Sequence, residues 1–241
     1  MLAELASRSV TVRTRKELVD VAPSGADKVV ARFADGTTAE GDLLVGADGV
    51  RSGTRAAVFP DAPAPAFAGA IGVSGIAPAA VAPGLSARDK QSLTSTFGAR
   101  GLFCYCGTRG GDVLWWSHLC RAHPLGPREL EGHADERLRQ ELLDLFDRYH
   151  APIPALIEAS SPLVTFNLFD VASLPRWHAG RVVLVGDAAH AMSPSSGQGA
   201  PLALEDAMDL ARRLRDDVDP ARGNQDWVYR YRVDWGTVAA G

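Results

Sequence analysis

The sequence lacks the features that would identify several large classes of protein. Its three cysteines are an odd number, which argues against a disulfide framework and for a reducing compartment. No apolar run approaches the ~20 residues that a membrane helix needs. The first residues, from Met1 to Arg8, are interrupted by the charge of Glu4 and lack the apolar core of a signal peptide. We therefore expect a soluble, cytoplasmic protein with no membrane partner.

Clusters of basic residues are absent as well. The 241 residues include 25 Lys and Arg against 29 Asp and Glu, which gives a net charge of −4. Nucleic acids and anionic surfaces attract concentrated positive charge, so neither is expected as a partner. With 46% hydrophobic residues, the chain can bury one large core or two small ones.

The apolar pattern predicts α/β segments at both ends of the chain and a mostly β middle. A turn is expected at Asp35-Gly36, and Ser52 is placed to cap a short helix. Strands are expected at 9–15, 29–33, 42–46, 70–76, 92–97, 102–106, 113–119, 163–169 and 182–185. Helices are expected at 52–59, at 127–149 with prolines 152 and 154 as its stop, at 199–216, and at 224–233.

Prolines 60, 63 and 65 form a stiff connector that marks a domain boundary. The two motifs described below lie on either side of the β-rich middle, so they are expected to share one domain. We therefore predict one domain from residues 1–64 and 171–241, with a second domain from 65–170 inserted between them. The run at 42–46 predicts a strand that is buried on both faces.

The stretch from Arg181 to Gly199 combines a β-branched strand, an acidic turn, a Pro/Ser/Gly loop and an abrupt helix start. Asp187 directly follows the strand, which places its carboxylate at the carboxyl edge of a sheet, where α/β folds bind ligands. A carboxylate there can bind a ribose hydroxyl or order the backbone around a pyrophosphate. An Asp that caps its own loop is an equally good interpretation.

Gly197 and Gly199 enclose Gln198 and let the backbone approach a planar or anionic group at a helix N-terminus. For such a pair alone, an ordinary glycine-rich helix entry is the simpler interpretation. Solvated structural roles are expected for the acidic residues of the helix that follows, Glu205, Asp206 and Asp209.

Taken together, these residues resemble the class A FAD-dependent aromatic hydroxylases, the family that includes p-hydroxybenzoate hydroxylase. The segment from Gly186-Asp187 through Pro194 and Gly197-x-Gly199 to Asp206 is similar to the second flavin-binding motif of that family. The segment 42–55, with Asp48-Gly49, is similar to its Asp-Gly motif. The resemblance implies an α/β (α+β) fold: a truncated FAD-binding domain with an inserted, mostly antiparallel β substrate domain.

The resemblance also implies a flavin-dependent monooxygenase, in which FAD, NADPH and O2 hydroxylate or epoxidise an aromatic or polyketide-like small molecule. By position, Asp187 would bind the ribityl–pyrophosphate region, and Pro194 would lie against the isoalloxazine ring. The backbone of 197–200 would contact the pyrimidine edge of that ring, and Asp48-Gly49 would help shape the pyrophosphate site and the approach of NADPH. No side chain is identified as a catalytic acid or base. The cofactor-binding candidates are Asp48, Gly49, Gly186, Asp187, Pro194, Gly197, Gln198, Gly199 and Ala200.

Two departures from the family pattern stand out. The sequence contains no G-x-G-x-x-G, so the resemblance implies that the phosphate-binding βαβ unit is missing and that the strands 43–45 and 182–185 lose a sheet neighbour. Pro201 stands where the family commonly has Asn, and proline offers no N–H to the flavin, although it also suits the first turn of a helix.

Three interpretations stay open from these departures. The chain binds FAD weakly unless a complementary chain or a swapped dimer completes the site. Alternatively, it is a flavin-free descendant that binds a small molecule or catalyses a redox-neutral cyclisation or isomerisation, or it is one part of a longer enzyme.

A cluster of soft ligands is the remaining candidate. Cys104, Cys106, His118 and Cys120 could share one side of a hairpin. Their spacing matches no standard zinc pattern and buried cysteine is usually inert, so no metal is expected.

Overall fold

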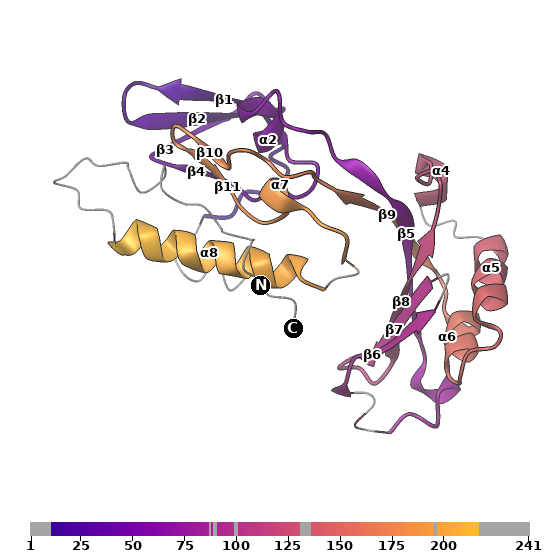
Figure 1. Ribbon diagram of the computed structural model, residues 1–241. Coiled ribbons are helices and arrows are strands. Elements are labelled where there is room, and N and C mark those ends of the chain that lie inside the picture. The colour runs from indigo at the N-terminus through magenta and orange to yellow at the C-terminus, as the bar shows by residue number, and fades with distance from the viewer. Residues whose placement is uncertain are drawn as a thin grey trace. The chain divides into compact units, whose positions relative to one another are not determined.

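A computed structural model describes residues 11–86, 88, 91–98, 101–130, 136–194 and 197–216. The chain divides into two compact units, one from Met1–Ala66 with Asp170–Gly241 and the other from Phe67–Phe169 (Figure 1). No helix among the described residues is long and apolar enough to cross a membrane. The helix expected at 224–233 lies outside the described residues.

The first unit begins with an antiparallel meander of β1 (Leu18–Ser24), β2 (Lys28–Phe33) and β3 (Thr38–Gly41). The expected turn between β2 and β3 is confirmed, with Gly36 at a φ of 79°, which glycine adopts without a steric penalty.

The strand expected at 9–15 is wrong where it is described. Residues 11–15 form no strand, and their side chains are all exposed. Val12 is 39% exposed, and Arg15 has a φ of 58°, which interrupts an extended backbone.

A second sheet of the first unit has the order β10 (His178–Ala179), β11 (Val182–Leu184) and β4 (Leu44–Gly46). β4 and β11 are parallel, whereas β10 and β11 are antiparallel. The helices α2 (Gly53–Val58), α7 (Asp187–His190) and α8 (Gly199–Asp216) complete this unit. The expectation that β4 is buried on both faces is wrong, because Val45 is 40% exposed while its neighbours point to the covered face.

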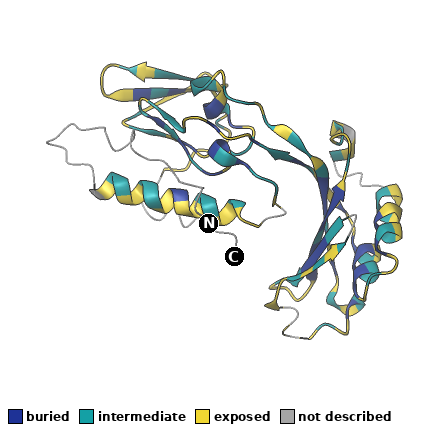
Figure 2. Cartoon of the chain, in the orientation of Figure 1, coloured by how far each residue is buried: buried dark blue, intermediate teal, exposed yellow. Residues whose placement is uncertain are grey.

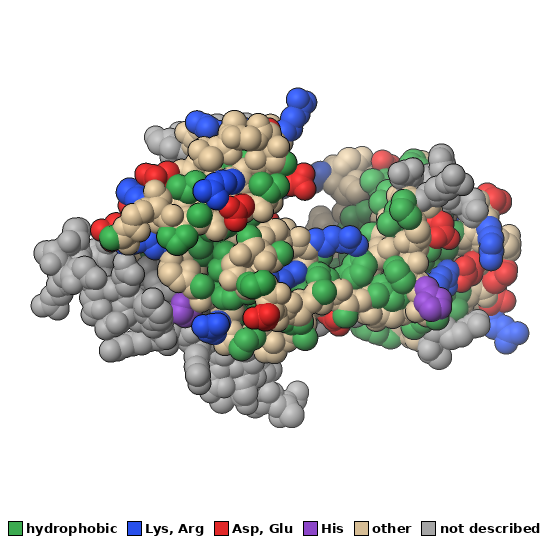
Figure 3. All heavy atoms as spheres, turned by 90° about the horizontal axis from the view of Figure 1, so that it is seen from above, with side chains coloured by type: hydrophobic (Ala, Val, Ile, Leu, Met, Phe, Trp, Pro, Cys, Tyr) green, Lys and Arg blue, Asp and Glu red, His purple; other side chains and the backbone are tan. Residues whose placement is uncertain are grey.

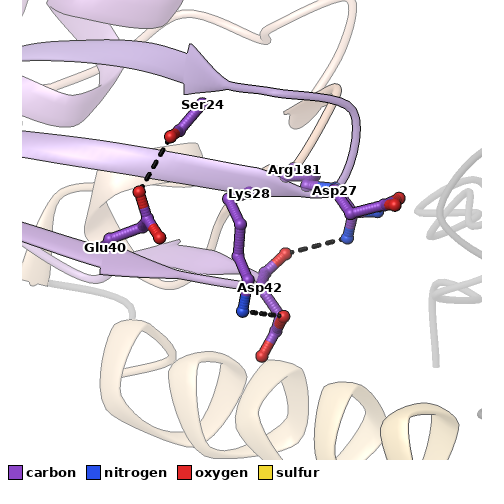
Figure 4. A network of polar contacts seen from close by, with 6 residues as sticks. All are labelled: Ser24, Asp27, Lys28, Glu40, Asp42 and Arg181. Carbon is purple, nitrogen blue, oxygen red and sulfur yellow. Dashed lines mark hydrogen bonds and ion pairs between the residues drawn. The ribbon is translucent and has the colours of Figure 1, made fainter.

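Arg181 connects the two sheets of the first unit at the surface. Its guanidinium donates to the carbonyl oxygen of Asp42 at 3.0 Å and pairs with Asp27 at 2.6 Å (Figure 4). Close by, Lys28 pairs with Asp42 at 2.7 Å and lowers the pKa of that carboxyl below its ordinary value. Exposed pairs of this kind contribute little stability, so they mainly fix how the strand ends lie.

The second unit is a five-stranded sheet covered by helices on one side. The sheet has the order β6 (Thr94–Gly98), β7 (Gly101–Gly107), β8 (Val113–Cys120), β5 (Ala66–Ala77) and β9 (Val164–Asp170). The pairs β6–β7, β7–β8 and β5–β8 are antiparallel. Helices α4 (Pro127–Leu130), α5 (Glu136–Phe146) and α6 (Ile153–Ala159) and the 3-10 helix η1 (Ala79–Val81) accompany it, with α5 and α6 on one face (Figure 1).

The core of the second unit lies between that face and the helices. Trp115 is fully buried, stacks on Phe103 with ring centroids 5.1 Å apart, and donates its indole N–H to Ser160 at 2.7 Å. The helix expected at 127–149 is described as α4 and α5, residues 131–135 lie outside the described residues, and α5 ends at Phe146, before the expected end at 149. The prolines expected to stop it instead begin α6, since proline suits a first helical turn.

The opposite face of this sheet carries exposed apolar side chains. Ile76, Phe97, Val164 and Phe166 are 54%, 80%, 55% and 39% exposed. The ring of Phe166 covers Gly72, because a Cβ at that glycine would lie 2.2 Å from the ring. This face therefore combines aromatic and aliphatic groups, and the described helices of the second unit lie on the other face (Figure 1).

Candidate functional site

Two of the predicted motifs meet at one edge of the β4–β11 sheet. The parallel register pairs Leu44 with Val182 and Gly46 with Leu184, so the two strands end side by side. Asp48 follows the end of β4, and Asp187 follows the end of β11. The structure therefore places both acidic turns at the carboxyl edge of neighbouring parallel strands, which is the usual ligand-binding edge of such sheets.

Asp48 is held by the start of α2. One carboxylate oxygen accepts the hydroxyl of Ser52, and the other accepts the N–H and hydroxyl of Thr54, both at 2.9 Å. Partial burial alone would raise the pKa of Asp48, but these hydrogen bonds outweigh it and the pKa lies below its ordinary value. The expected cap by Ser52 is also confirmed, since its oxygen accepts the N–H of Arg55 at 2.8 Å. Asp48 thus shapes its own loop, next to Gly49 with a φ of 80°.

Arg55 links the two motifs. Its side chain is buried, and its guanidinium donates to the carbonyl oxygen of Ala188 in α7 at 2.9 Å and to that of Val50. Burial lowers the pKa of Arg55 and the charge of Asp48 opposes that shift. Sequence reasoning included Arg55 in the first motif and gave it no role, because the contact spans 133 residues of sequence.

Gly186 and Asp187 form a tight turn between β11 and α7. Gly186 has a φ of 56° and a ψ of −142°, a conformation that is accessible almost only to glycine. A Cβ there would lie 3.1 Å from the Cβ of Ala203, so α8 approaches this turn closely. Asp187 is exposed, and its carboxylate lies 3.8 Å from the position of a Cβ on Gly199. The structure thus brings Asp187 to the start of α8.

The glycine-rich turn before α8 is exposed. Gly197 has a φ of 67° and donates its N–H to the carbonyl oxygen of Pro194 at 3.0 Å. Gln198 and Ala200 are exposed, and α8 begins at Gly199. Pro201 occupies the first turn of α8, where an N–H has no partner within the helix, so proline costs the fold nothing there. The flavin donor that the resemblance assigns to this position is nevertheless absent.

Asp206 contradicts its expected solvated role. Its residue exposure is 7%, and one carboxylate oxygen accepts the N–H of Gly186 at 2.7 Å while lying 2.6 Å from Nε2 of His190. Both residues lie within the second motif, but sequence reasoning gave Asp206 a solvated structural role and gave His190 no role. Gly199, Ala203 and Asp206 recur at helical spacing, and the two small residues were the available signal that this face of α8 packs closely.

A cavity of about 530 Å³ lies beside Asp48 in the first unit. Its volume falls within the range of small-molecule sites. Val45, the exposed residue of β4, forms part of its wall. The complete lining is Lys16, Glu17, Leu18, Leu44, Val45, Ala47, Asp48, Arg51, Gly53 and Thr54. The candidates Gly186, Asp187 and 197–200 are therefore not part of this cavity.

The soft-ligand candidates of the second unit do not form a metal site. Among the described residues, no group of three or more His, Cys, Asp or Glu is placed to hold a metal ion. Cys104 instead contacts the hydroxyl of Ser95 at 3.3 Å, and burial raises the pKa of its thiol.

Charge on the surface is mixed. Figure 3 shows Lys and Arg side chains interspersed with Asp and Glu on the face that it presents. The described residues on that face therefore form no continuous field of one sign.

Comparison with known proteins gives a consistent result. The family described as FAD binding domain matches residues 1–224. Aurachin C monooxygenase/isomerase of Stigmatella aurantiaca is 40% identical over 79% of this chain and 47% of the relative. 6-Hydroxynicotinate 3-monooxygenase of Pseudomonas fluorescens is 33% identical over 78% of this chain and 48% of the relative.

Solved structures are similar too. Klebsiella pneumoniae HpxO complexed with FAD and uric acid has a TM-score of 0.70 and 29% identity, covering 86% of this chain and 51% of that structure. The chain spans about half the length of the curated relatives it matches.

Proposed function

The chain belongs to the FAD binding domain family of class A flavin monooxygenases, and from this we propose that it forms part of the FAD site of an FAD-dependent monooxygenase. The proposed substrate is an aromatic or polyketide-like small molecule, with NADPH and O2 as co-substrates. The relatives are named for their action on aurachin C and 6-hydroxynicotinate, and these names support the substrate class.

The observation that carries the proposal is the meeting of three segments in the first unit. The Asp48 and Asp187 turns end neighbouring parallel strands, and the carboxylate of Asp187 lies against the start of α8. The backbone N–H groups of Gly199 and Ala200 belong to the first turn of α8, where N–H groups lack helical partners. An exposed carboxylate beside exposed backbone donors fits both the hydroxyl groups and the polar ring edge of FAD.

In the proposed site, Asp187 accepts hydrogen bonds from the ribityl hydroxyls, and residues 197–200 contact the pyrimidine edge of the ring through their backbone. Pro194 shapes the turn before Gly197, and Gly186 shapes the turn before Asp187. Asp48 and Gly49 fix the loop after β4. Bound FAD would supply the redox chemistry, and the residues of this chain would bind and orient it.

The second unit is proposed to bind the substrate. Its sheet presents Ile76, Phe97, Val164 and Phe166 on the face away from the helices. Exposed apolar faces of this kind mark binding surfaces more often than ordinary protein surface. An aromatic substrate would be held there by apolar contact, with Trp116 on the same face half-buried.

A further polypeptide segment is proposed to complete the FAD site. Among the described residues, β4 pairs only with β11, and the cavity containing Val45 runs beside it. On α8, Leu204 and Met208 are 65% and 74% exposed, one turn apart. Parallel sheets are normally covered and paired, so an apolar strand at the edge of β4 is the partner that fits. A complementary chain and a swapped dimer are the two proposed sources of such a strand.

A flavin-free function is the second candidate, and Pro201 is the observation that favours it. Proline at this position removes a backbone donor from the proposed ring-binding turn. A protein that binds a small molecule, or catalyses a redox-neutral cyclisation or isomerisation, would not need that donor.

The test is to purify the full chain, record its visible absorption and titrate FAD while following flavin fluorescence. Saturable binding supports the flavoprotein proposal and refutes the flavin-free one. Mass measurement in solution with and without FAD decides between a dimer and a complementary chain. Failure to bind FAD in every oligomeric form, and also beside a co-expressed complementary chain, would refute the flavoprotein proposal.

A further inference from the structure

Helix α8 contains one buried residue among those that the structure describes, and that residue is an acid. Asp206 is the single buried position in a helix that otherwise has half-buried and exposed residues (Figure 2). Burying a carboxylate is unfavourable unless hydrogen bonds and charges compensate for the lost water. Asp206 therefore needs partners.

Both described partners come from the segment that follows β11. Oδ2 of Asp206 accepts the N–H of Gly186 at 2.7 Å and lies 2.6 Å from Nε2 of His190. The side chains of Asp206 and His190 are 6% and 11% exposed. One carboxylate oxygen thus joins α8 to the first residue of the Gly186 turn and to the last residue of α7.

These contacts determine where α8 begins. Ala203 lies against Gly186, with 3.1 Å between the Ala203 Cβ and the position of a Cβ on the glycine. From Asp206 back to Gly199 is seven residues of helix, or ~10 Å of rigid rod. The position of Asp206 therefore helps to set how far the start of α8 lies from Asp187.

We propose that Asp206 is a positioning residue, which acts through Gly186 and His190 to hold the Asp187 turn and the start of α8 at the spacing that FAD requires. The inference rests on the proposed function, and Asp206 itself does not touch the cofactor.

The electrostatics agree with this geometry. Burial alone lowers the pKa of His190, but the hydrogen bond and charge of Asp206 on α8, with the charge of Asp187 on α7, outweigh it. The pKa of His190 therefore lies above its ordinary value of 6.5. The ring of Trp177 packs against the imidazole of His190, with 5.0 Å between the ring centroids.

The test compares Asp206→Asn with Asp209→Asn in the full chain. Asp209 lies one turn further along α8 and pairs with Arg212 and Arg213 of the same helix, so it controls for loss of an acid. Hydrogen exchange of the FAD-free protein is measured first. Asp206→Asn is expected to speed hydrogen exchange at 186–190 and 197–202 by about tenfold. That factor corresponds to the stability lost when a typical hydrogen bond to a charged group is removed. Asp209→Asn leaves both segments unchanged. Equal exchange in the two variants would overturn the inference.

FAD titration supplies the second readout. Asp206→Asn is expected to weaken FAD binding by about tenfold and Asp209→Asn by less than about twofold. Faster exchange with unchanged FAD affinity would overturn the positioning role. If the unsubstituted chain binds no FAD in any form, the proposed function fails, and the exchange data still decide whether Asp206 holds the two segments together.

His190 variants cover the case in which Asp206→Asn does not fold. His190→Ala keeps the bond from Gly186 to Asp206 and removes the other donor, so both segments should exchange faster. His190→Gln retains an amide donor and should restore slow exchange. If His190→Gln and His190→Ala exchange equally fast, the proposed contact between His190 and Asp206 is contradicted.

Discussion

Replacement of Arg55 by Met tests the link between the two motifs. The substitution keeps most of the side-chain volume and removes two hydrogen bonds, to the carbonyl oxygens of Ala188 and Val50. A buried acceptor that loses its partner costs about 1–3 kcal/mol. Removal of the buried guanidinium charge also removes its desolvation penalty, which offsets part of this free-energy cost. We expect the free energy of unfolding to fall by about 2–4 kcal/mol, a large fraction of the ~5–15 kcal/mol that a typical domain has.

Guanidinium unfolding followed by circular dichroism measures this loss. Arg32→Met is the matched control, because Arg32 is exposed and pairs with Asp20 on the surface. The control should change stability by less than about 0.5 kcal/mol. Arg55→Lys should fall between the two, since a single ammonium does not reproduce the planar donor set of a guanidinium. If Arg55→Met loses no more stability than Arg32→Met, the proposed link between the two motifs through Arg55 is refuted.

Three further predictions follow from single contacts. Gly186→Ala should lose about 1–3 kcal/mol in thermal unfolding because its backbone conformation excludes a Cβ, whereas Gly84→Ala, with open space around it, should be nearly neutral. Trp115→Phe should lose about 1–2 kcal/mol by leaving Ser160 without its indole donor, and an unchanged unfolding midpoint would contradict this. Because the pKa of His190 is raised on folding, its pairing stabilises fully below about pH 6.5 and is lost as the pH rises through the folded pKa. The stability difference between the parent and His190→Gln should therefore shrink with rising pH, and a constant difference would contradict it.

Local patterns in the sequence predicted much of the fold. The strands β7 and β8 are short, mostly apolar runs separated by a glycine-containing turn, and α8 has a clear glycine-rich start. The errors arose where local and longer-range effects differ. The described part of the expected strand, residues 11–15, is exposed and forms no strand, and the prolines at 152 and 154 begin a helix instead of ending one.

The candidate site was predicted less completely than the fold. The parallel pairing of β4 with β11 puts Asp48 and Asp187 at one edge, as their position after short apolar strands suggests. The roles of Arg55 and Asp206 could not be inferred, because each depends on a partner that is distant in sequence and on burial that only packing creates. Acidic residues near a helix start are usually solvated, and that tendency gave the wrong expectation for Asp206.

The most direct test of the central claim is the dissociation constant of FAD for the full chain, for Asp187→Asn and for Asp209→Asn. Asp187 is exposed at the strand edge, so its replacement should leave the fold intact. The account predicts saturable FAD binding by the unsubstituted chain, about tenfold weaker binding by Asp187→Asn, and unchanged binding by Asp209→Asn. No saturable binding, or equal binding by all three proteins, would contradict it.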